Sequence, residues 1–548
     1  MASGEKIYNL EKPAHAEEIL RMLNDDADEN NLLDDLGDES GSDEDHLESR
    51  EVDSETEQED EQDESVIGNA KNAATPIECW SLFFTDEMLN IILTYTNQYI
   101  EEVKVKYERE RDTKPIDSIE LKAFIGLLFL AGVYKANRLC LEELWGINGD
   151  GVEKFHLVMS IKRFKFIMRC LRFDDRLTRY ERKQEDRLAA VREIFTQFVH
   201  NCKKNYSLGE YVTVDEKLEA FRGRCPFRQY IPSKPAKYGI KIFALVDAKL
   251  CYTYNLEIYA GQQPNGPFQN SNKPSDVIRR LIQPILGSGR NLTADNWFTE
   301  FDLVEELRQN KISYVGTVRK NKKQLPPEFI TSIGRKEYSS IFGFMPCTTL
   351  VSYVPKKGKT VILVSTLHED KSVNIETGYK TKPNIITFYN ETKGGVDTVD
   401  KMCESFNVAR NVRRWPMVIF FAMLNMSGIN AQIIYHGNGK KDLRRRYFLR
   451  QLSHELVLGQ LTRRSEITSG IPFTLQAGLK RFRPNSQENV SQKQDEPQKK
   501  RRCEPCTLEA NIRRLSRFCC AKCRKALCLQ HAIFQCSACS NASINDNI

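Results

Sequence analysis

The spacing of hydrophobic residues changes along the chain, and each change predicts a different kind of element. From Trp80 to about Ser207 the apolar residues recur with the period of a helix. Residues 117–134 (DSIELKAFIGLLFLAGVY) form a long apolar segment that is too short and too interrupted by charge to span a bilayer. Residues 186–202 (DRLAAVREIFTQFVHNC) have the i, i+3, i+4 spacing of an amphipathic helix. We therefore predict a helical region at the start of the folded chain.

The pattern then becomes that of β-strands, rich in β-branched and aromatic residues. Three strands are predicted first, at 211–218, 238–249 and 251–260. The second and third form a hairpin that turns near Lys249. A helix, a strand, a helix and a strand are predicted to follow, at 275–286, 290–295, 300–309 and 312–318. Strands followed by alternating helix and strand around one sheet predict an α/β domain.

Residues 320–383 interrupt this alternation. They begin with KNKKQLPPE, continue with short strands at 348–354 and 360–367, and predict an inserted, partly β module. A strand at 384–389 (NIITFY) and a helix from Lys393 are predicted to return to the core. A helical, basic stretch follows at about 416–465.

Charge is distributed unevenly. Residues 25–64 hold 21 Asp or Glu and one basic residue, Arg50, so we expect residues 1–75 to be a disordered acidic tail. The rest of the chain has 79 Lys and Arg against 54 Asp and Glu, which favours a polyanionic partner such as nucleic acid. There is no run of 18 apolar residues and the start, MASGEKIYNLEK, lacks the apolar stretch of a secretory signal, so we expect no membrane association.

Four carboxylates stand where the predicted elements would display them. Asp215 is embedded in an apolar strand, Asp295 ends the strand RNLTAD, and Asp397 and Asp400 are three residues apart on one helical face. Carboxylates that converge from separate elements can hold two Mg²⁺ ions about 4 Å apart, as phosphodiester chemistry requires. Each aspartate could instead form a salt bridge or cap a helix.

Cysteines crowd near the end of the chain. Eight of the 16 lie between Cys503 and Cys539, and four pairs with two-residue gaps supply eight zinc ligands for two closed sites. The ligands are Cys503, Cys506, Cys520, Cys523, Cys528, His531, Cys536 and Cys539. Four-residue links between the later pairs favour a cross-brace, with pairs one and three on one ion and pairs two and four on the other. Two sequential fingers are the alternative, and Cys519 could replace Cys520.

Two basic clusters are candidate DNA contacts, because guanidinium groups beside aromatic rings suit phosphate and base contacts. One comprises Lys440, Lys441, Arg444, Arg445 and Arg446, and the other comprises Arg410, Arg413 and Arg414, which precede Trp415. A solvated helix face is the alternative for each residue. The run KKRR at 499–502 resembles a nuclear import signal, and we expect a nuclear protein.

The contexts TVDEKLEAFRGR, GRNLTADNWFT, YNETKGGVDTVDKM and RRWPMVIFFAMLNM resemble the piggyBac transposase family, in that order, over residues 77–540. The resemblance implies an RNase H-like catalytic core with an inserted domain, flanked by helical DNA-binding segments. It also implies excision through hairpins, insertion at TTAA, and a homodimer whose cysteine-rich domain reads the transposon-end DNA. It places Asp215, Asp295 and Asp397 on the catalytic, magnesium-binding triad, Asp400 on an additional active-site aspartate, and Trp415 near the active site.

The pattern and the resemblance together give expected boundaries. These are an acidic tail (1–75), a helical dimerisation and DNA-binding part (76–210), the core (211–320), the insertion (321–383), the second core part (384–408), a second helical part (409–483), a basic linker (484–502) and a zinc domain (503–540). The main hypothesis is an active cut-and-paste transposase. A domesticated DNA-binding protein without cleavage activity is the alternative, and a zinc-dependent ubiquitin ligase or histone reader would explain only the C-terminal segment.

Overall fold

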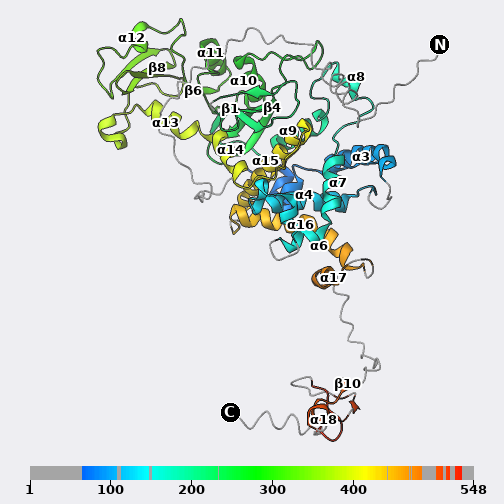
Figure 1. Ribbon diagram of the computed structural model, residues 1–548. Coiled ribbons are helices and arrows are strands. Elements are labelled where there is room, and N and C mark those ends of the chain that lie inside the picture. Colours follow the sequence, from blue (N-terminus) through cyan, green and yellow to red (C-terminus); the bar gives the residue numbers. More distant parts are fainter. Residues whose placement is uncertain are drawn as a thin grey trace, which may run out of the picture. The chain divides into compact units, whose positions relative to one another are not determined.

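The computed structural model describes residues 65–107, 113–146, 151–232, 234–440, 442–467, 470, 472–483, 501–509, 512, 514–516, 518 and 525–532. The chain divides into two compact units, with the boundary between Phe482 and Arg483 (Figure 1). Most of the expected acidic tail, Lys441 and residues 484–500 lie outside the described part, and so do Cys519, Cys520, Cys523, Cys536 and Cys539.

Short and long helices make up the first part of the larger unit. They are α2 (Pro76–Ser81), α3 (Asp86–Val103), α4 (Ser118–Val133), α5 (Leu141–Leu144), α6 (Glu153–Val158), α7 (Ile161–Cys170), α8 (Arg179–Lys183) and α9 (Arg192–Lys204). The predicted helix at 186–202 therefore begins only at Arg192. Asp186 instead lies in a turn before α9, where its buried carboxylate accepts hydrogen bonds from the Arg192 guanidinium.

The end of the expected tail belongs to the fold. Val66 is buried and forms a β-bridge with Tyr206, and Ala70 lies in a 3₁₀ helix at Gly68–Asn72. Thr75 then caps α2, because its side chain accepts the Glu78 N–H while the Glu78 side chain accepts the Thr75 N–H. The ordered chain thus starts at least ten residues before the predicted boundary.

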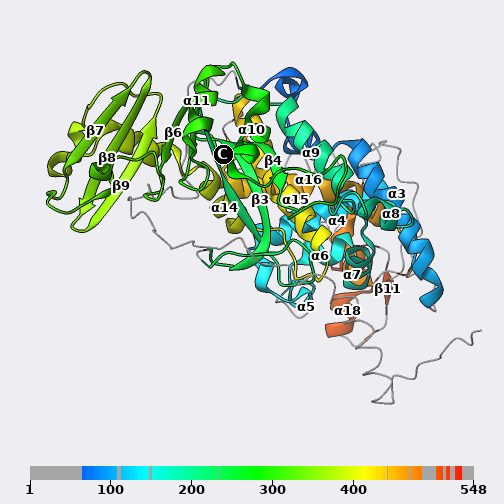
Figure 2. The same cartoon turned by 90° about the horizontal axis from the view of Figure 1, so that it is seen from above.

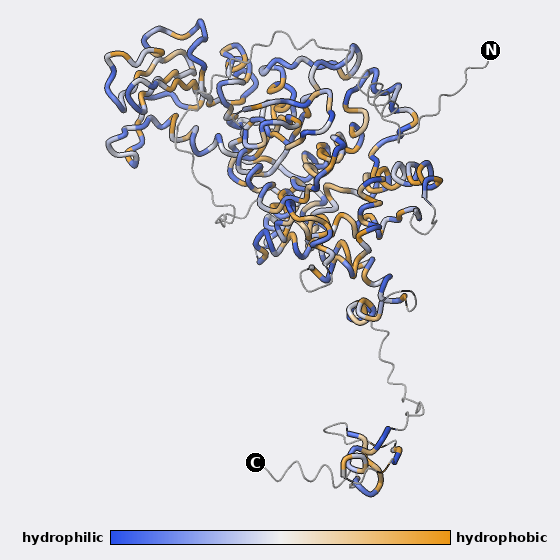
Figure 3. Tube along the Cα trace, viewed as in Figure 1, coloured by the Kyte–Doolittle hydropathy of each residue, from blue (hydrophilic) through white to orange (hydrophobic). Residues whose placement is uncertain are grey.

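Two apolar helices form the centre of the larger unit. The α4 segment is buried over most of its circumference, as is α15 (Trp415–Gly437). The second is long and apolar enough to cross a membrane, but 94% of its apolar window is buried inside the protein, so it is a core helix. The hydropathy colouring of Figure 3 shows apolar residues gathered where these helices meet α16 (Arg445–Ser465).

A nine-stranded mixed sheet forms the other half of the core. Its strands are β1 (Tyr211–Ala220), β2 (Gln229–Tyr230), β3 (Tyr238–Asp247), β4 (Thr253–Ile258), β5 (Asn291–Ala294), β6 (Ser313–Thr317), β7 (Ser340–Met345), β8 (Thr348–Lys356) and β9 (Lys359–Ser365). The order is β2-β3-β1-β5-β6-β9-β8-β7, with β4 also paired to β3. The pairs β1–β5 and β5–β6 are parallel, whereas β1–β3, β3–β4 and β6–β9 are antiparallel. These strands confirm the predicted hairpin and the α/β class, with α10 (Pro274–Ile282) and α11 (Phe301–Gln309) between the parallel strands.

The inserted segment extends this sheet rather than forming a separate one, as the view in Figure 2 shows. Strand β9 pairs with β6, and β7 is the outer strand. The segment contains α12 (Pro327–Ile330) and is covered by α13 (Asn384–Thr392). The prediction of a strand at 384–389 is therefore wrong, because these residues belong to α13. Ile385, Ile386 and Tyr389 pack against Val315 and Leu363 of the sheet. Their i, i+1, i+4 spacing is that of one face of a helix.

The remaining elements complete the two units. The larger unit contains α14 (Gly395–Ser405) and α17 (Phe473–Leu479). The smaller unit contains β10 (Arg501–Arg502), α18 (Glu504–Glu509) and β11 (Leu515–Ser516), and β10 pairs antiparallel with β11.

Candidate active site and metal centre

The parallel pairing of β1 with β5 places Asp215 beside Asp295. Val214 is opposite Ala294 in the register, and each aspartate is the next residue of its strand segment. Both residues therefore lie where the parallel pairing of β1 with β5 ends, at the carboxyl end of β5, while β1 itself continues to Ala220. Open α/β sheets build their sites at the carboxyl ends of their parallel strands. The Asp295 carboxylate accepts the Trp297 N–H at 2.9 Å, which fixes its orientation.

Helix α14 brings the third aspartate to this end of the sheet. Thr213 and Lys217 point to the same face of β1 as Asp215, because side chains alternate along a strand. The Thr213 hydroxyl donates to the Thr392 carbonyl at 2.5 Å, and a Cβ on Gly395 would lie 3.2 Å from that hydroxyl. The start of α14 therefore lies directly on β1, and Asp397 follows two residues later.

Asp400, one turn along α14, has a fixed partner. The Lys217 ammonium donates to its carboxylate at 2.5 Å and lies 3.0 Å from Glu219. Since Lys217 is only 4% exposed, this ion pair attaches α14 to β1 in the interior. The geometry thus gives Asp400 a structural partner, while leaving Asp397 more exposed.

Burial and mutual repulsion perturb the carboxylates. Burial raises the pKa of Asp215 well above its ordinary value, and the charges of Glu216, Asp295 and Asp397 raise it further, against the opposing effect of Lys234. Burial also raises the pKa of Asp295 to about 6, with Glu216 as the next cause. The acidic groups of β5 and α14 therefore both act on Asp215 of β1.

The donor set fits a hard divalent cation. Carboxylate oxygens are the ligands that Mg²⁺ prefers, and a cation would relieve the repulsion that perturbs them. One buried oxygen of Glu216 also has no hydrogen-bond partner among the described residues. The carboxylate oxygens nevertheless lie further apart than the ligand atoms of a closed metal site. No three acidic groups in the described ranges have oxygens within 4.8 Å of one another.

Sequence reasoning did not identify the charged residues that surround the aspartates. Glu216 and Lys217 follow Asp215 directly, and Lys234 lies in the segment between β2 and β3. The signal was present in β1, where three consecutive charged residues directly follow the buried residues Val212–Val214. The sequence around Lys234 gives no comparable indication of a site, because Lys234 and Asp397 come close together only in the folded chain.

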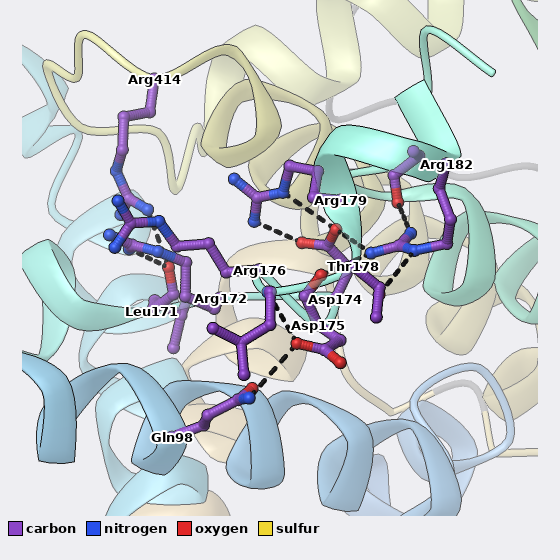
Figure 4. Close-up of polar contacts among 12 residues, drawn as sticks. Gln98, Leu171, Arg172, Asp174, Asp175, Arg176, Thr178, Arg179, Arg182 and Arg414 are labelled. Carbon is purple, nitrogen blue, oxygen red and sulfur yellow. Dashed lines mark hydrogen bonds and ion pairs between the residues drawn. The ribbon is translucent and has the colours of Figure 1, made fainter. Parts of the chain in front are cut away.

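The basic residues before α15 divide into buried and exposed ones. Arg414 donates to the carbonyls of Leu171 and Met168, both at 2.8 Å, next to a network in which Arg179 and Arg182 bind Asp174 (Figure 4). Its neighbour Arg413 is exposed. Arg414 therefore connects the start of α15 to the end of α7 rather than presenting its guanidinium at the surface.

Arg410 and Arg445 are likewise internal. Arg410 donates to the Ala136 carbonyl and Arg445 to the Met402 carbonyl, and each residue is 9% exposed. Burial lowers the pKa of both guanidinium groups to about 10, so they remain charged at neutral pH. These two arginines and Arg414 are better explained as internal contacts, which corrects the expectation of direct DNA contact. Four of the predicted residues are exposed, namely Arg413, Lys440, Arg444 and Arg446.

Trp415 begins α15 and is half-buried. Its ring meets Phe227 edge to face, with centroids 5.0 Å apart. Phe227 lies in the connection between β1 and β2, the strand that precedes Lys234. The aromatic pair therefore connects α15 to the segment that borders the aspartates.

The smaller unit contains a compact group of four candidate ligands. Cys503, Cys506, Cys528 and His531 have all their ligand atoms within 4.8 Å of one another. The Cys506 and Cys528 sulfurs are 3.6 Å apart, and the His531 Nδ1 lies 3.3–3.5 Å from the three sulfurs. A disulfide needs about 2.05 Å between sulfurs. A tetrahedral ion with Zn–S bonds of about 2.3 Å places its ligands about 3.5–3.8 Å apart, so the group fits such an ion.

This grouping brings pairs one and three together, as the cross-brace prediction requires. Backbone N–H groups and neighbouring ligands lower the pKa of Cys528 to about 6, although burial acts in the opposite direction. A lowered thiol pKa favours the thiolate form that binds metal. The second predicted group, of pairs two and four, lies outside the described residues.

Comparisons with known proteins show which family the chain belongs to. Residues 75–432 match the family model described as Transposase IS4, which spans more than half of the chain. The chain therefore belongs to this family, and within it to the piggyBac-type transposases.

Two human relatives and one solved structure illustrate the likeness. PiggyBac transposable element-derived protein 3 is 24% identical over 371 residues, covering 64% of this chain and 60% of its own length. PiggyBac transposable element-derived protein 2 is 23% identical over 368 residues, covering 62% of this chain and 58% of its own length. The chain thus spans less than two thirds of these relatives. The cryo-EM structure of a piggyBac transposase synaptic complex with hairpin DNA superimposes with a TM-score of 0.72 at 36% identity, over 87% of this chain and 99% of that one.

Proposed function

We propose that this chain is a cut-and-paste DNA transposase that cleaves transposon ends and inserts them at TTAA by metal-dependent phosphodiester transfer. The observation that carries the proposal is the convergence of Asp215, Asp295 and Asp397 from β1, β5 and α14. The order β4-β3-β1-β5-β6, antiparallel and then parallel, supports an RNase H-like core around them.

Each aspartate has a proposed role. Asp215, on the strand that contacts both β5 and α14, would hold Mg²⁺ together with Asp295 on β5 and Asp397 on α14. Bound Mg²⁺ activates the attacking oxygen and stabilises the leaving 3′ oxygen. Lys217 keeps Asp400 in place, so Asp400 would act by positioning α14 rather than as a ligand.

The partner in this proposal is double-stranded DNA, bound by a homodimer in the nucleus. The likeness to a transposase solved as a synaptic complex with hairpin DNA supports a DNA partner, and the exposed Arg413, Lys440, Arg444 and Arg446 are available for phosphate contacts. Zn²⁺ in the cysteine group would stabilise a small domain that reads transposon-end DNA. The import signal would include Arg501 and Arg502, which are exposed.

A domesticated DNA-binding protein is the second candidate. It is favoured by the human relatives, whose names describe proteins derived from transposable elements. Binding without cleavage would still use the fold and the exposed basic residues. The three converging aspartates favour the catalytic candidate, because carboxylates close together are costly without a cation.

A cleavage assay separates the two candidates. The purified protein is incubated with Mg²⁺ and a duplex that carries its own element's ends flanked by TTAA, beside the Asp397→Asn variant. Hairpin-ended products from the unmodified protein alone are expected. Equal DNA binding by both proteins with no product from either would instead establish the domesticated protein.

A further inference from the structure

Lys234 lies where the three aspartates would bind their cation. It belongs to the segment between β2 and β3, which is closed by hydrogen bonds from Ile231 N–H to the Lys237 carbonyl and from Lys237 N–H to the Lys234 carbonyl. The two strands pair at Tyr230 and Tyr238 on either side. These hydrogen bonds involve the backbone of Lys234 and leave its side chain to contact the site.

The Lys234 ammonium contacts two of the elements that build the site. It donates to the Glu216 carbonyl on β1 at 3.2 Å and lies 3.5 Å from the Asp397 carboxylate on α14. The charges of Asp215, Asp397, Glu216 and Asp400 all act on it. Its side chain is 21% exposed, so it can also reach solvent.

The other cations near the site have partners of their own. Lys217 is bound to Asp400 and Glu219, Lys241 lies 4.3 Å over the Trp297 ring, and Arg319 donates to Asn296. Lys234 is thus the cation that lies between β1 and the Asp397 carboxylate in the described part of the site.

We propose that Lys234 is a positioning residue that takes the place of the divalent cation: it holds Asp397 close to Asp215 in the metal-free protein and leaves Asp397 when metal binds. The inference rests on the proposed function. A bound Mg²⁺ would compete with the Lys234 ammonium for the Asp397 carboxylate, because both cations are attracted to its oxygens. The flexible four-carbon stem of lysine allows the group to move away. Lys234 therefore lowers the affinity of the site for metal and holds the carboxylates in place before metal binds.

The test is a Mn²⁺ titration of the zinc-loaded, full-length protein without DNA, by calorimetry. Asp215→Asn identifies the part of the signal that comes from the aspartate site. Lys234→Gln removes the competing charge and should bind Mn²⁺ about tenfold more tightly, since a unit charge a few ångströms away opposes a divalent cation strongly. Lys234→Arg retains the charge and should not bind more tightly than the unmodified protein.

Lys237→Gln is the matched control. Lys237 is exposed in the same turn, and its side chain is not among the groups that act on Asp215. Its Mn²⁺ affinity should equal that of the unmodified protein. A damaged site would bind metal more weakly, so tighter binding cannot come from misfolding.

The outcomes separate this inference from the proposed function. Mn²⁺ binding that is lost in Asp215→Asn but unchanged or weakened in Lys234→Gln would overturn the inference and leave the function intact. If the Asp215→Asn variant binds Mn²⁺ as tightly as the unmodified protein does, both the inference about Lys234 and the proposed function are overturned.

Discussion

Asp295 is a residue whose surroundings oppose its charge. Its pKa is raised to about 6 by burial and by Glu216, whereas an aspartate in the unfolded chain titrates near its ordinary value of 3.8. Between these two values the folded chain holds a proton that the unfolded chain has released. The contribution of Asp295 to stability is therefore largest at low pH and falls as the pH rises through this window.

Replacing Asp295 by Asn should accordingly stabilise the metal-free protein at neutral pH. The amide keeps the oxygen that accepts the Trp297 N–H, and removal of the charge should add about 1–2 kcal/mol at pH 7.5 and about half of that at about pH 5. Thermal unfolding at the two pH values measures the difference. The same change at the exposed Asp302 should leave the melting temperature within about 1 °C. Equal effects of Asp295→Asn at both pH values would contradict the raised pKa.

Arg413 and Arg414 are adjacent in the sequence but differ in environment. The sequence showed two basic residues before an aromatic one, and this pattern does not reveal which guanidinium the fold will bury. Arg414 donates to the carbonyls of Leu171 and Met168. Its removal would take this donor from the Met168 carbonyl, whereas the Leu171 carbonyl would still accept from Arg172.

Arg414→Ala should lower the free energy of unfolding by about 2 kcal/mol, whereas Arg413→Ala should change it by less than about 0.5 kcal/mol. DNA affinity should respond in the opposite order, because only Arg413 is exposed. Denaturant unfolding and a salt-dependent DNA-binding titration measure the two effects. A stable Arg414→Ala variant with weakened DNA binding would restore the expectation of direct contact.

At the scale of elements, periodicity predicted the long helices and most of the strands, and it failed where propensity and packing disagree. The segment NIITFY has the composition of a strand, yet it forms α13 because Pro383 precedes it and the sheet offers a surface for Ile385, Ile386 and Tyr389. Asp215 and Asp295 could be singled out because they interrupt or end apolar strands, and Asp397 and Asp400 because they share a helical face. Their convergence could not be derived from the sequence alone, since it depends on the parallel register of β1 with β5 and on the packing of α14.

Gly395 allows α14 to approach β1, and its neighbour Gly394 does not face the strand. A Cβ at 395 would be 3.4 Å from the Thr213 Cβ and 3.5 Å from the Ala248 Cα, whereas a Cβ at 394 would meet only the Thr398 hydroxyl at 3.9 Å. The two glycines therefore form a matched pair for testing how α14 positions Asp397.

Gly395→Val should lower the free energy of unfolding by about 1–3 kcal/mol and reduce DNA cleavage, because the larger side chain pushes α14 and Asp397 away from β1. Gly394→Val should change stability by less than about 1 kcal/mol and retain cleavage. Unfolding curves and the hairpin assay measure both variants. Full cleavage by Gly395→Val would show that close packing of α14 is not required.

At the scale of the whole molecule, the chain consists of two units with different sources of stability. The larger unit has an extensive apolar core that joins its helices to the sheet. Among the described residues of the smaller unit, the buried cluster consists of Cys503, Cys506 and Cys528. Because these residues are also the candidate metal ligands, we expect this unit to depend on metal to fold.

Cys528→Ser should therefore remove one zinc ion per chain and leave the main unfolding transition unchanged. Metal analysis of the purified protein measures the first effect, and calorimetry measures the second. The exposed-surface control is Cys347→Ser in the larger unit, which should alter neither quantity. An unchanged zinc content in Cys528→Ser would exclude the ligand group described above.

The three aspartates are 80 and 102 residues apart in the sequence, and the last of them lies in a helix that packs on the first strand. During synthesis, the ribosome releases β1 and β5 long before α14, so a growing chain has two of the three carboxylates until residue 397 has emerged. Under the proposed function, a chain terminated before residue 397 could not cut the genome, whatever part of the sheet it has formed. The order of elements along the chain would thus delay nuclease activity until α14 has been made.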